Sequence, residues 1–215
     1  MSAGRALTLL GFGVGGVGLI LQFSISIPAY LANGRSLGDA LVTYFSYFTI
    51  LTNLTLVLIY LADLVAVRGL SWFRSPVTRA MMAGVMVLVM LFYHFLLAQL
   101  SLPQGLFLLC SVTLHYVTPI LYALWWGLVA RHGEVVGWRD TPKMMLPPLV
   151  YVVYAMLRGA IVGEYPYPIL EANRLGYPQA IANIVIVAIT LTVLFVFVIA
   201  IDRYLARTSP SRTTA

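Results

Sequence analysis

The chain has 215 residues, of which 61% are hydrophobic and only 9% are charged, and its mean hydropathy is +0.93. Because soluble domains carry about 25% charged residues, this composition excludes an ordinary soluble domain and predicts an integral membrane protein whose first partner is the lipid bilayer. The formal net charge of +6 fits basic loops beside a membrane, and no nucleic-acid partner is expected.

Six apolar segments are long enough to cross the hydrocarbon core of a bilayer, which needs about 20 helical residues. In chain order they are expected at residues 7–31, 39–67, 78–100, 104–129, 144–162 and 178–205. Together they form one membrane domain, residues 1–205, followed by a polar cytoplasmic tail at 206–215. The sequence therefore predicts an all-α integral membrane protein, a bundle of six transmembrane helices.

The first segment carries a cluster of glycines, which favours close packing of membrane helices. They are Gly11, Gly13, Gly15, Gly16 and Gly18. A phosphate-binding loop is rejected here, because no strand precedes the cluster and no Lys-Ser or Lys-Thr follows it. The fifth segment opens near Pro147 and Pro148, which suit a helix start. Three tryptophans, Trp125, Trp126 and Trp138, are expected to anchor the bundle at a membrane surface.

The basic residues divide unevenly between the two sides of the predicted bundle. Three lie on one side, Arg35, Arg158 and Arg174. Ten lie on the other side: Arg5, Arg68, Arg74, Arg79, Arg131, Arg139, Lys143, Arg203, Arg207 and Arg212. Since Lys and Arg concentrate in cytoplasmic loops, both termini are expected to be cytoplasmic. Short loops with this topology suit a bacterial inner membrane as well as an endomembrane.

The second segment contains an unusual run of hydrogen-bonding residues. At helical spacing, Thr49, Thr52 and Asn53 fall on one face. Such a face is explained either by hydrogen bonds that hold membrane helices together or by an active site. A threonine hydroxyl bonded to a carbonyl of its own helix is the common structural explanation.

Depth in the membrane distinguishes some of these polar groups. Counted from the outer ends of their helices at 1.5 Å per residue, Thr49 lies about 15 Å deep and His115 about 18 Å deep. His94, Arg158 and Glu171 are expected nearer the outer surface. This gathering in one half of the bundle predicts a site that opens toward the outer leaflet.

Each charged or titratable candidate also has a structural explanation. His115 can be a neutral histidine bonded to a backbone carbonyl, although intramembrane ionisable groups are functional by default. His94 beside Tyr93 suits a membrane interface, and Arg158 can pair with Glu164. A zinc site from His94, His115 and an acid is disfavoured, because no helix concentrates ligands at metal-binding spacing. No metal and no cofactor are expected.

Three separated blocks resemble one family: Phe48-Thr49, His115 followed by Pro119, and Tyr167-Pro-Ile-Leu-Glu171. In these blocks the chain resembles the androgen-induced and androgen-dependent transmembrane proteins, which are threonine hydrolases of fatty-acid esters of hydroxy fatty acids. It is most similar to the bacterial six-span membrane proteins related to them, which favours a bacterial inner membrane.

The resemblance implies a catalytic threonine at Thr49 and a catalytic histidine at His115, with Thr52 as an alternative match one turn away. The chain departs from the family ahead of the third block. It has Arg158, Gly159 and Glu164 where the animal members are richer in histidine and tryptophan. This departure leaves the substrate open.

Two functions follow as hypotheses. The first is an intramembrane hydrolase of lipid esters, of the fatty-acid ester of hydroxy fatty acid type that the resemblance implies. Thr49 is its nucleophile and His115 its base, with Asn53 and Thr52 in support of the oxyanion. Its expected substrate-binding residues are Arg158, Tyr167, Glu171 and His94. The alternative is a non-enzymatic lipid-binding module or small carrier. A separation of more than about 4–5 Å between the Thr49 hydroxyl and both His115 nitrogens favours that alternative.

Overall fold

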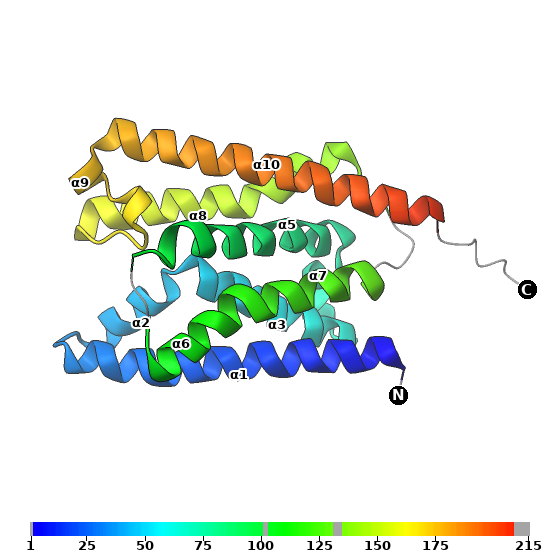
Figure 1. Ribbon diagram of the computed structural model, residues 1–215, viewed down its shortest axis with the longest axis horizontal. Helices are drawn as coiled ribbons and strands as arrows, with labels where there is room; N and C mark the ends of the chain where they lie inside the picture. The colour runs from blue at the N-terminus through cyan, green and yellow to red at the C-terminus, as the bar shows by residue number, and fades with distance from the viewer. Residues whose placement is uncertain (1, 101–102, 131–134, 209–215) are drawn as a thin grey trace, which may run out of the picture.

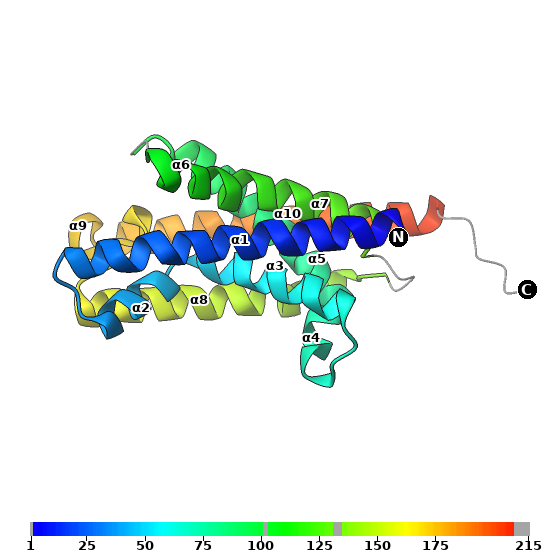
Figure 2. The same ribbon diagram turned by 90° about the horizontal axis from the view of Figure 1, so that it is seen from below.

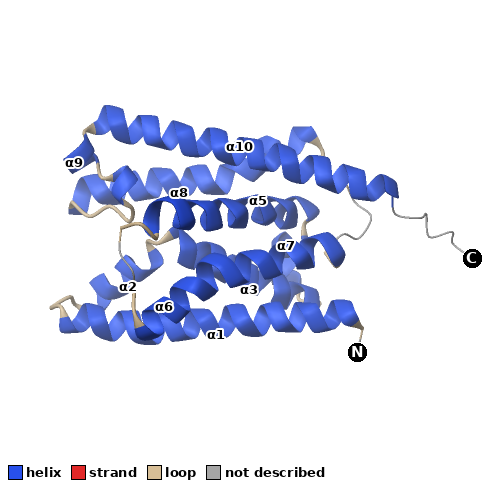
Figure 3. Ribbon diagram, in the orientation of Figure 1, coloured by secondary structure: helices blue, strands red, loops and turns tan. Residues whose placement is uncertain are grey.

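The computed structural model describes residues 2–100, 103–130 and 135–208, and every regular element in these ranges is a helix (Figure 3). Five helical stretches are long and apolar enough to cross a membrane, and a sixth is obtained if one bent pair of helices is a single span. The long helices include α1 (Ala3–Ala32), α5 (Pro76–Phe92), α8 (Thr141–Val162) and α10 (Tyr177–Thr208). The all-helical class predicted from composition is confirmed for the described residues.

The second expected segment is bent rather than straight. It consists of α2 (Leu37–Phe45) and α3 (Phe48–Leu64), whose axes differ by 74°. The prediction of one continuous helix over residues 39–67 is therefore wrong. Tyr47 adopts an extended conformation, with φ −79° and ψ 125°, and the carbonyl of Ser46 accepts a hydrogen bond from the Tyr151 hydroxyl at 3.0 Å. A side chain of α8 thus takes the place of a helical amide at the break.

Two other expected segments contain π-helical turns. A π turn (Tyr93–Leu97) follows α5, and a second (Thr113–Val117) separates α6 (Gly105–Val112) from α7 (Thr118–Leu128). In such turns each amide bonds the carbonyl five residues back instead of four, and they occur frequently at functional sites. These turns are named here the first and the second π turn.

The remaining elements are short. They are η1 (Arg68–Leu70), α4 (Ser71–Arg74), η4 (Trp138–Asp140), η5 (Pro168–Leu170) and α9 (Ala172–Leu175). The predicted helix start near Pro147 and Pro148 is wrong, because α8 already begins at Thr141 and both prolines lie inside it. Helix α10 extends into the expected tail, of which residues 209–215 lie outside the described residues.

The long helices run side by side along one axis of the molecule, with α1 and α10 on opposite sides (Figure 1). Helix α1 starts and α10 ends at the same end of the bundle, while α4 projects from its side (Figure 2). Helix α5 is buried without interruption over residues 78–86. A helix that is buried all round lies in the core, so the other helices are arranged around α5.

Glycines allow the closest helix contacts, as the sequence predicted for α1. A Cβ on Gly11 would overlap the ring of Tyr60, and a Cβ on Gly84 would overlap the ring of Phe195. Gly15 and Gly18 also meet side chains of neighbouring helices, whereas Gly13 and Gly16 have nothing close by. The packing face of α1 is therefore formed by Gly11, Gly15 and Gly18.

A buried polar network ties four helices together near the start of α1. Arg79 Nη2 lies 3.0 Å from Asp63 Oδ1, and Asp63 Oδ2 accepts a hydrogen bond from the Thr8 hydroxyl at 3.2 Å. The Trp125 indole in turn donates to the Thr8 hydroxyl at 2.8 Å. Arg79 was counted among the basic residues of the cytoplasmic side, and its side chain is almost completely buried.

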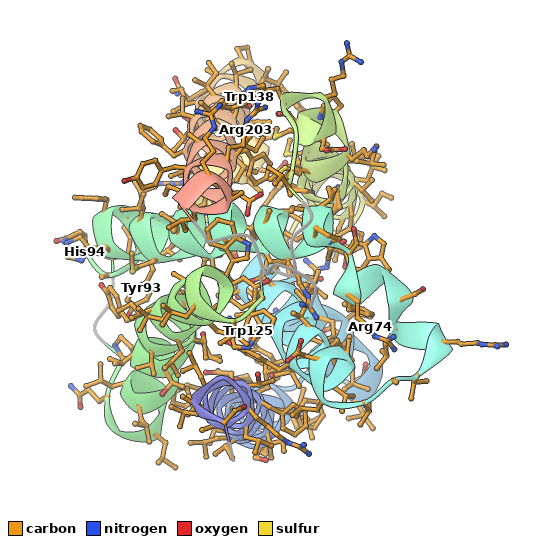
Figure 4. All side chains as sticks on the ribbon, turned by 90° about the vertical axis from the view of Figure 1, so that its right-hand side faces the viewer. Arg74, Tyr93, His94, Trp125, Trp138 and Arg203 are labelled. Atoms are coloured by element: carbon orange, nitrogen blue, oxygen red, sulfur yellow. The ribbon has the colours of Figure 1, made fainter. Side chains whose placement is uncertain are left out.

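The tryptophans divide between core and surface. Trp125 and Trp126 are buried, so their assignment as membrane-surface anchors is wrong. Trp125 lies in the middle of the bundle in Figure 4, where its ring also lies 5.2 Å from the Arg79 guanidinium. Trp138 remains about half exposed and packs against Arg203, as Figure 4 shows.

The outward faces of the long helices are apolar. Ile20, Ile161 and Phe197 are 68%, 82% and 60% exposed, respectively. Soluble proteins rarely expose large contiguous apolar areas. The surface is thus compatible with an integral membrane protein.

Candidate functional site

The break between α2 and α3 places Thr49 in the first turn of a helix. The first amides of a helix have no partner within it, and the backbone N–H of Thr49 donates instead to the Tyr167 hydroxyl at 3.3 Å. The N-terminus of a helix also carries the positive end of its dipole. Thr49 is therefore a hydroxyl beside a cluster of hydrogen-bond donors.

The second π turn directs His115 at this hydroxyl. Thr49 Oγ1 lies 3.2 Å from His115 Nε2, and His115 Nδ1 lies 2.9 Å from the Ser111 carbonyl oxygen. A carbonyl only accepts hydrogen bonds, so Nδ1 carries the proton and the neutral ring presents the lone pair of Nε2 to Thr49. The two side chains meet at a distance that permits proton transfer.

The first π turn holds the histidine ring from its face. The rings of Tyr93 and His115 are stacked, with centroids 4.0 Å apart and planes inclined by 18°. The carbonyl of Ser111 fixes the ring's edge and Tyr93 fixes its plane. Both π turns therefore contribute to the position of one imidazole, in agreement with the tendency of such turns to occur at functional sites.

Tyr167 closes the site from the loop between α8 and α10. Its hydroxyl lies 3.5 Å from Thr49 Oγ1, and its ring packs edge-on against Tyr47 and Phe92. Burial raises the pKa of the Tyr167 hydroxyl above its ordinary value of 10. Tyr167 therefore keeps its proton at neutral pH and can donate it in a hydrogen bond.

These groups face a cavity that is otherwise apolar. It has a volume of about 810 Å³, its open mouth included, and is called here the apolar cavity. Its only side chains with oxygen or nitrogen atoms, among the described residues, are Thr49, His115, Tyr151 and Tyr167. The rest of its wall is apolar and comes from α3, α5, the first π turn, α8, η5 and α10. Pockets of this kind, apolar with a few convergent polar groups, are the usual form of a small-molecule site.

Asn53 was expected to stabilise an oxyanion, and the structure gives it another task. Its Nδ2 donates to the carbonyls of Thr49 at 2.9 Å and Leu114 at 3.1 Å, while its Oδ1 accepts from the Thr118 hydroxyl at 2.5 Å. The side chain is fully buried and does not line the apolar cavity. Asn53 is thus a positioning residue that holds α3 against the second π turn.

Pro119 explains why the Leu114 carbonyl is free to accept. Proline has no N–H, and Pro119 lies five residues after Leu114, at the spacing of a π-helical hydrogen bond. The carbonyl of Leu114 therefore lacks that helical donor. It accepts from Asn53 Nδ2 instead, and the Thr118 hydroxyl oxygen lies 3.2 Å from it.

Asn53→Ala is expected to destabilise the fold and to reduce any activity of the site together. The substitution leaves the Thr118 hydroxyl and two buried carbonyls without this partner, and each such loss costs about 1–3 kcal/mol. Thermal unfolding in detergent should show a lower melting temperature. Thr55→Ala is the matched control, because the Thr55 hydroxyl bonds only the Leu51 carbonyl of its own helix at 2.8 Å. Equal melting temperatures for the two variants would contradict the assigned role.

Two other expected site residues lie outside the apolar cavity. The Thr52 hydroxyl donates to the Thr49 carbonyl at 3.1 Å and so bonds only its own helix. His94 is exposed, with Nδ1 3.0 Å from the Tyr116 hydroxyl, and projects from the edge of the bundle in Figure 4. His94 was expected to bind substrate and does not line the apolar cavity, whereas its neighbour Tyr93 is buried and turns inward.

Arg158 and Glu171 line a second cavity that is polar. Arg158 Nη1 donates to the Glu164 carbonyl at 2.7 Å, and Arg158 Nη2 lies 3.3 Å from Glu164 Oε2. This ion pair was one of the structural explanations weighed for Arg158. Among the described residues no group of three or more His, Cys, Asp or Glu side chains has the geometry of a metal site.

Three contributors to the site were not singled out from the sequence. Tyr93 stacks on His115, Ser111 orients it through a backbone carbonyl, and Tyr151 lines the cavity. A contact made by a backbone carbonyl cannot be predicted from residue type, and π turns have no reliable sequence signature. Only the spacing of four between Ser111 and His115, one helical turn, is a usable signal.

No protein-family model, no curated protein and no solved structure matches the chain. The function of the site must therefore be inferred from its own geometry and chemistry.

Proposed function

We propose that the protein is an intramembrane hydrolase of lipid esters, with Thr49 as nucleophile and His115 as general base. The observation that carries the proposal is the 3.2 Å contact between Thr49 Oγ1 and His115 Nε2. The contact lies in the wall of an apolar cavity, and the other ring nitrogen is held by a carbonyl. A nucleophile, a base within hydrogen-bond reach and a third group that orients the base form the usual arrangement for covalent catalysis.

The reaction proceeds through an acyl-enzyme. Thr49 Oγ1 attacks the ester carbonyl carbon while His115 Nε2 takes the hydroxyl proton. The tetrahedral intermediate collapses, and the alcohol leaves with the proton from His115. Water then attacks the acyl-threonine, again giving a proton to His115, and the carboxylic acid is released as Thr49 recovers its proton. One water is consumed for each ester bond broken.

The developing oxyanion needs donors close to Thr49. The Thr49 backbone N–H and the Tyr167 hydroxyl are the nearest such groups, 3.3 Å apart. An ester oxygen that enters between them replaces their mutual hydrogen bond with two bonds to itself. Preorganised donors of this kind are worth about 3–4 kcal/mol each in other hydrolases. Tyr167 and Thr49 N–H therefore replace Asn53 as the oxyanion donors of the proposal.

The bundle is proposed to cross the membrane six times, with α2 and α3 as one broken span and both termini cytoplasmic. Helix α1 starts and helix α10 ends at the same end of the bundle (Figure 1), which supports an even number of crossings. Non-helical backbone at membrane depth is tolerated where it is buried in protein or lines a cavity. Ser46, buried, and Tyr47 beside it meet this condition. A bacterial inner membrane is the proposed location.

Membership of the androgen-induced transmembrane hydrolase family is part of the same proposal. Its support is spatial, because the three sequence blocks that carry the resemblance meet at one point. Thr49 contacts His115 and Tyr167, although these residues are 66 and 118 positions away in the chain.

A non-enzymatic lipid-binding module is the competing proposal, since an apolar cavity can hold a lipid without reacting with it. The two differ in what they require of Thr49 and His115. Binding alone needs no contact between them, whereas catalysis needs one within hydrogen-bond reach. The observed 3.2 Å favours the hydrolase.

Activity-based labelling tests the proposal. A fluorophosphonate with a long alkyl chain is expected to label the wild-type protein, because such probes react with activated hydroxyls. Peptide mass spectrometry should place the adduct on Thr49. Thr49→Ala should lose the label, while Thr52→Ala should keep it, because the Thr52 hydroxyl is outside the cavity. An unlabelled folded wild type, or undiminished labelling of Thr49→Ala, would refute the nucleophile.

A further inference from the structure

A polar cavity lies beside the apolar cavity, at the end of the bundle where α1 meets α2. Its volume is about 1070 Å³, its open mouth included. Its wall carries four charged side chains, Arg35, Arg158, Glu164 and Glu171, together with the hydroxyl and aromatic groups of Tyr30 and Tyr47. The cavity is large enough for a compact polar group.

The two cavities lie on either side of one aromatic contact. The rings of Tyr47 and Tyr167 pack edge to face, with centroids 6.0 Å apart. In each of the two segments that form this contact, neighbouring residues line different cavities. The polar cavity is lined by Ser46, Tyr47, Pro166 and Pro168, and the apolar cavity by Phe48, Thr49, Tyr167 and Ile169. The two cavities are therefore neighbours separated by these rings, and Thr49 lines the apolar one next to the boundary.

The charges of the polar cavity are already paired. Glu164 bridges Arg35, at 2.9 Å, and Arg158, at 3.3 Å. Glu171 pairs with Arg174 at 3.0 Å. The guanidinium of Arg35 holds the pKa of the Glu164 carboxyl below its ordinary value, so Glu164 is ionised at neutral pH.

The balance of positive and negative side chains in the polar cavity determines which polar group fits. Two arginines and two glutamates line the cavity, so its described wall has no net charge. A free carboxylate would have to separate Glu164 from an arginine, and it would lie close to two like charges. A neutral group with several hydroxyls keeps the ion pairs intact, because each hydroxyl can donate to a carboxylate and accept from a guanidinium.

We infer that the polar cavity holds a neutral polyol headgroup, the glycerol of a monoacylglycerol, while the acyl chain occupies the apolar cavity. The inference rests on the proposed function and specifies its substrate. Hydrolysis then breaks the bond between the acyl carbonyl and the glycerol oxygen. It consumes one water and releases a fatty acid and glycerol. Esters that carry a free carboxylate on the alcohol part are the poorer substrates.

A comparison of substrates tests the inference. Purified protein in detergent micelles is given 1-oleoylglycerol, methyl oleate, or a fatty-acid ester of hydroxystearic acid. The kcat/KM for 1-oleoylglycerol is expected to exceed the other two by about tenfold or more, because sites with paired polar groups discriminate strongly by hydrogen bonding. Equal rates, or a preference for the carboxylate-bearing ester, would overturn the headgroup inference and leave the proposed hydrolase standing.

A matched pair of variants locates the discrimination. Glu171→Gln is expected to raise KM for 1-oleoylglycerol about tenfold with little change in kcat, and to leave methyl oleate unaffected. Asp140→Asn is the control, because Asp140 forms a similar short-range ion pair with Lys143 at 2.9 Å but lies outside both cavities. Equal effects of the two variants would refute the inference. If no ester is cleaved and Thr49 is not labelled by the fluorophosphonate, the proposed function itself fails.

Discussion

Thr49→Ala is expected to lower kcat for ester hydrolysis by about 10³-fold or more, because among the described residues no other side-chain hydroxyl is hydrogen-bonded to His115. Tyr167 is the only other side-chain hydroxyl near Thr49 Oγ1 among the hydrogen bonds of the described residues, and it lacks a contact of its own with His115. The effect is measured as the rate at which fatty acid is released from the preferred ester.

Thr49→Ser separates chemistry from packing. It keeps the hydroxyl and removes only a methyl group, so activity within about tenfold of the wild type is expected. Thr55→Ala, on the same helix but bonded only to its own backbone, should retain activity. If Thr49→Ala were folded and fully active, the hydroxyl at this position would be structural and the nucleophile would have to be sought elsewhere.

His115→Ala is expected to lower kcat by about 10²–10⁴-fold, the usual contribution of a general base. KM should change little, because the ring contributes only a small part of the apolar cavity's wall. The variant also leaves a slot beside Tyr93, whose ring stacks on the imidazole at 4.0 Å. Added imidazole can occupy that slot, and partial recovery of activity with increasing imidazole is the expected result.

His94→Gln provides the matched control for the histidine. His94 belongs to the first π turn, is exposed, and bonds the Tyr116 hydroxyl rather than any group of the apolar cavity. Its replacement should leave kcat and KM near the wild-type values. Activity of His115→Ala within about tenfold of the wild type, with an unchanged melting temperature, would remove His115 from the mechanism.

The sequence placed Thr49 and His115 at similar depths in the membrane and left open whether they touch. Both are polar groups in long apolar runs, and counting residues from the helix ends put them at similar depths. Their contact at 3.2 Å does not depend on the straight helix assumed in that count. The local register is set by hydrogen bonds of Asn53 to Leu114 and Thr118, which no residue count contains.

Other features depended on tertiary contacts and could not be predicted. At the break between α2 and α3 the carbonyl of Ser46 accepts a hydrogen bond from Tyr151 of α8, and nothing in the local sequence indicates this partner. His94 and His115 looked alike as intramembrane histidines, but the π turn at residues 93–97 directs Tyr93 inward and His94 outward. Trp125 was expected to anchor the bundle at a membrane surface, whereas its indole donates to the buried Thr8 hydroxyl.

The missing amide of Pro119 has a consequence for how a flexible lipid could be accommodated. Without a donor from Pro119, the Leu114 carbonyl accepts a hydrogen bond from Asn53 on α3. This bond links two segments of the bundle instead of two turns of one helix. Packing of apolar side chains alone allows a helix to turn about its axis as neighbours shift, but a hydrogen bond at a fixed angle resists such rotation. Chains of different length and bend could therefore displace the apolar wall while Thr49, one turn before Asn53, keeps its orientation toward His115. Apolar packing of the cavity wall would then tolerate varied acyl chains, while the hydrogen bonds of Asn53 would keep Thr49 in position.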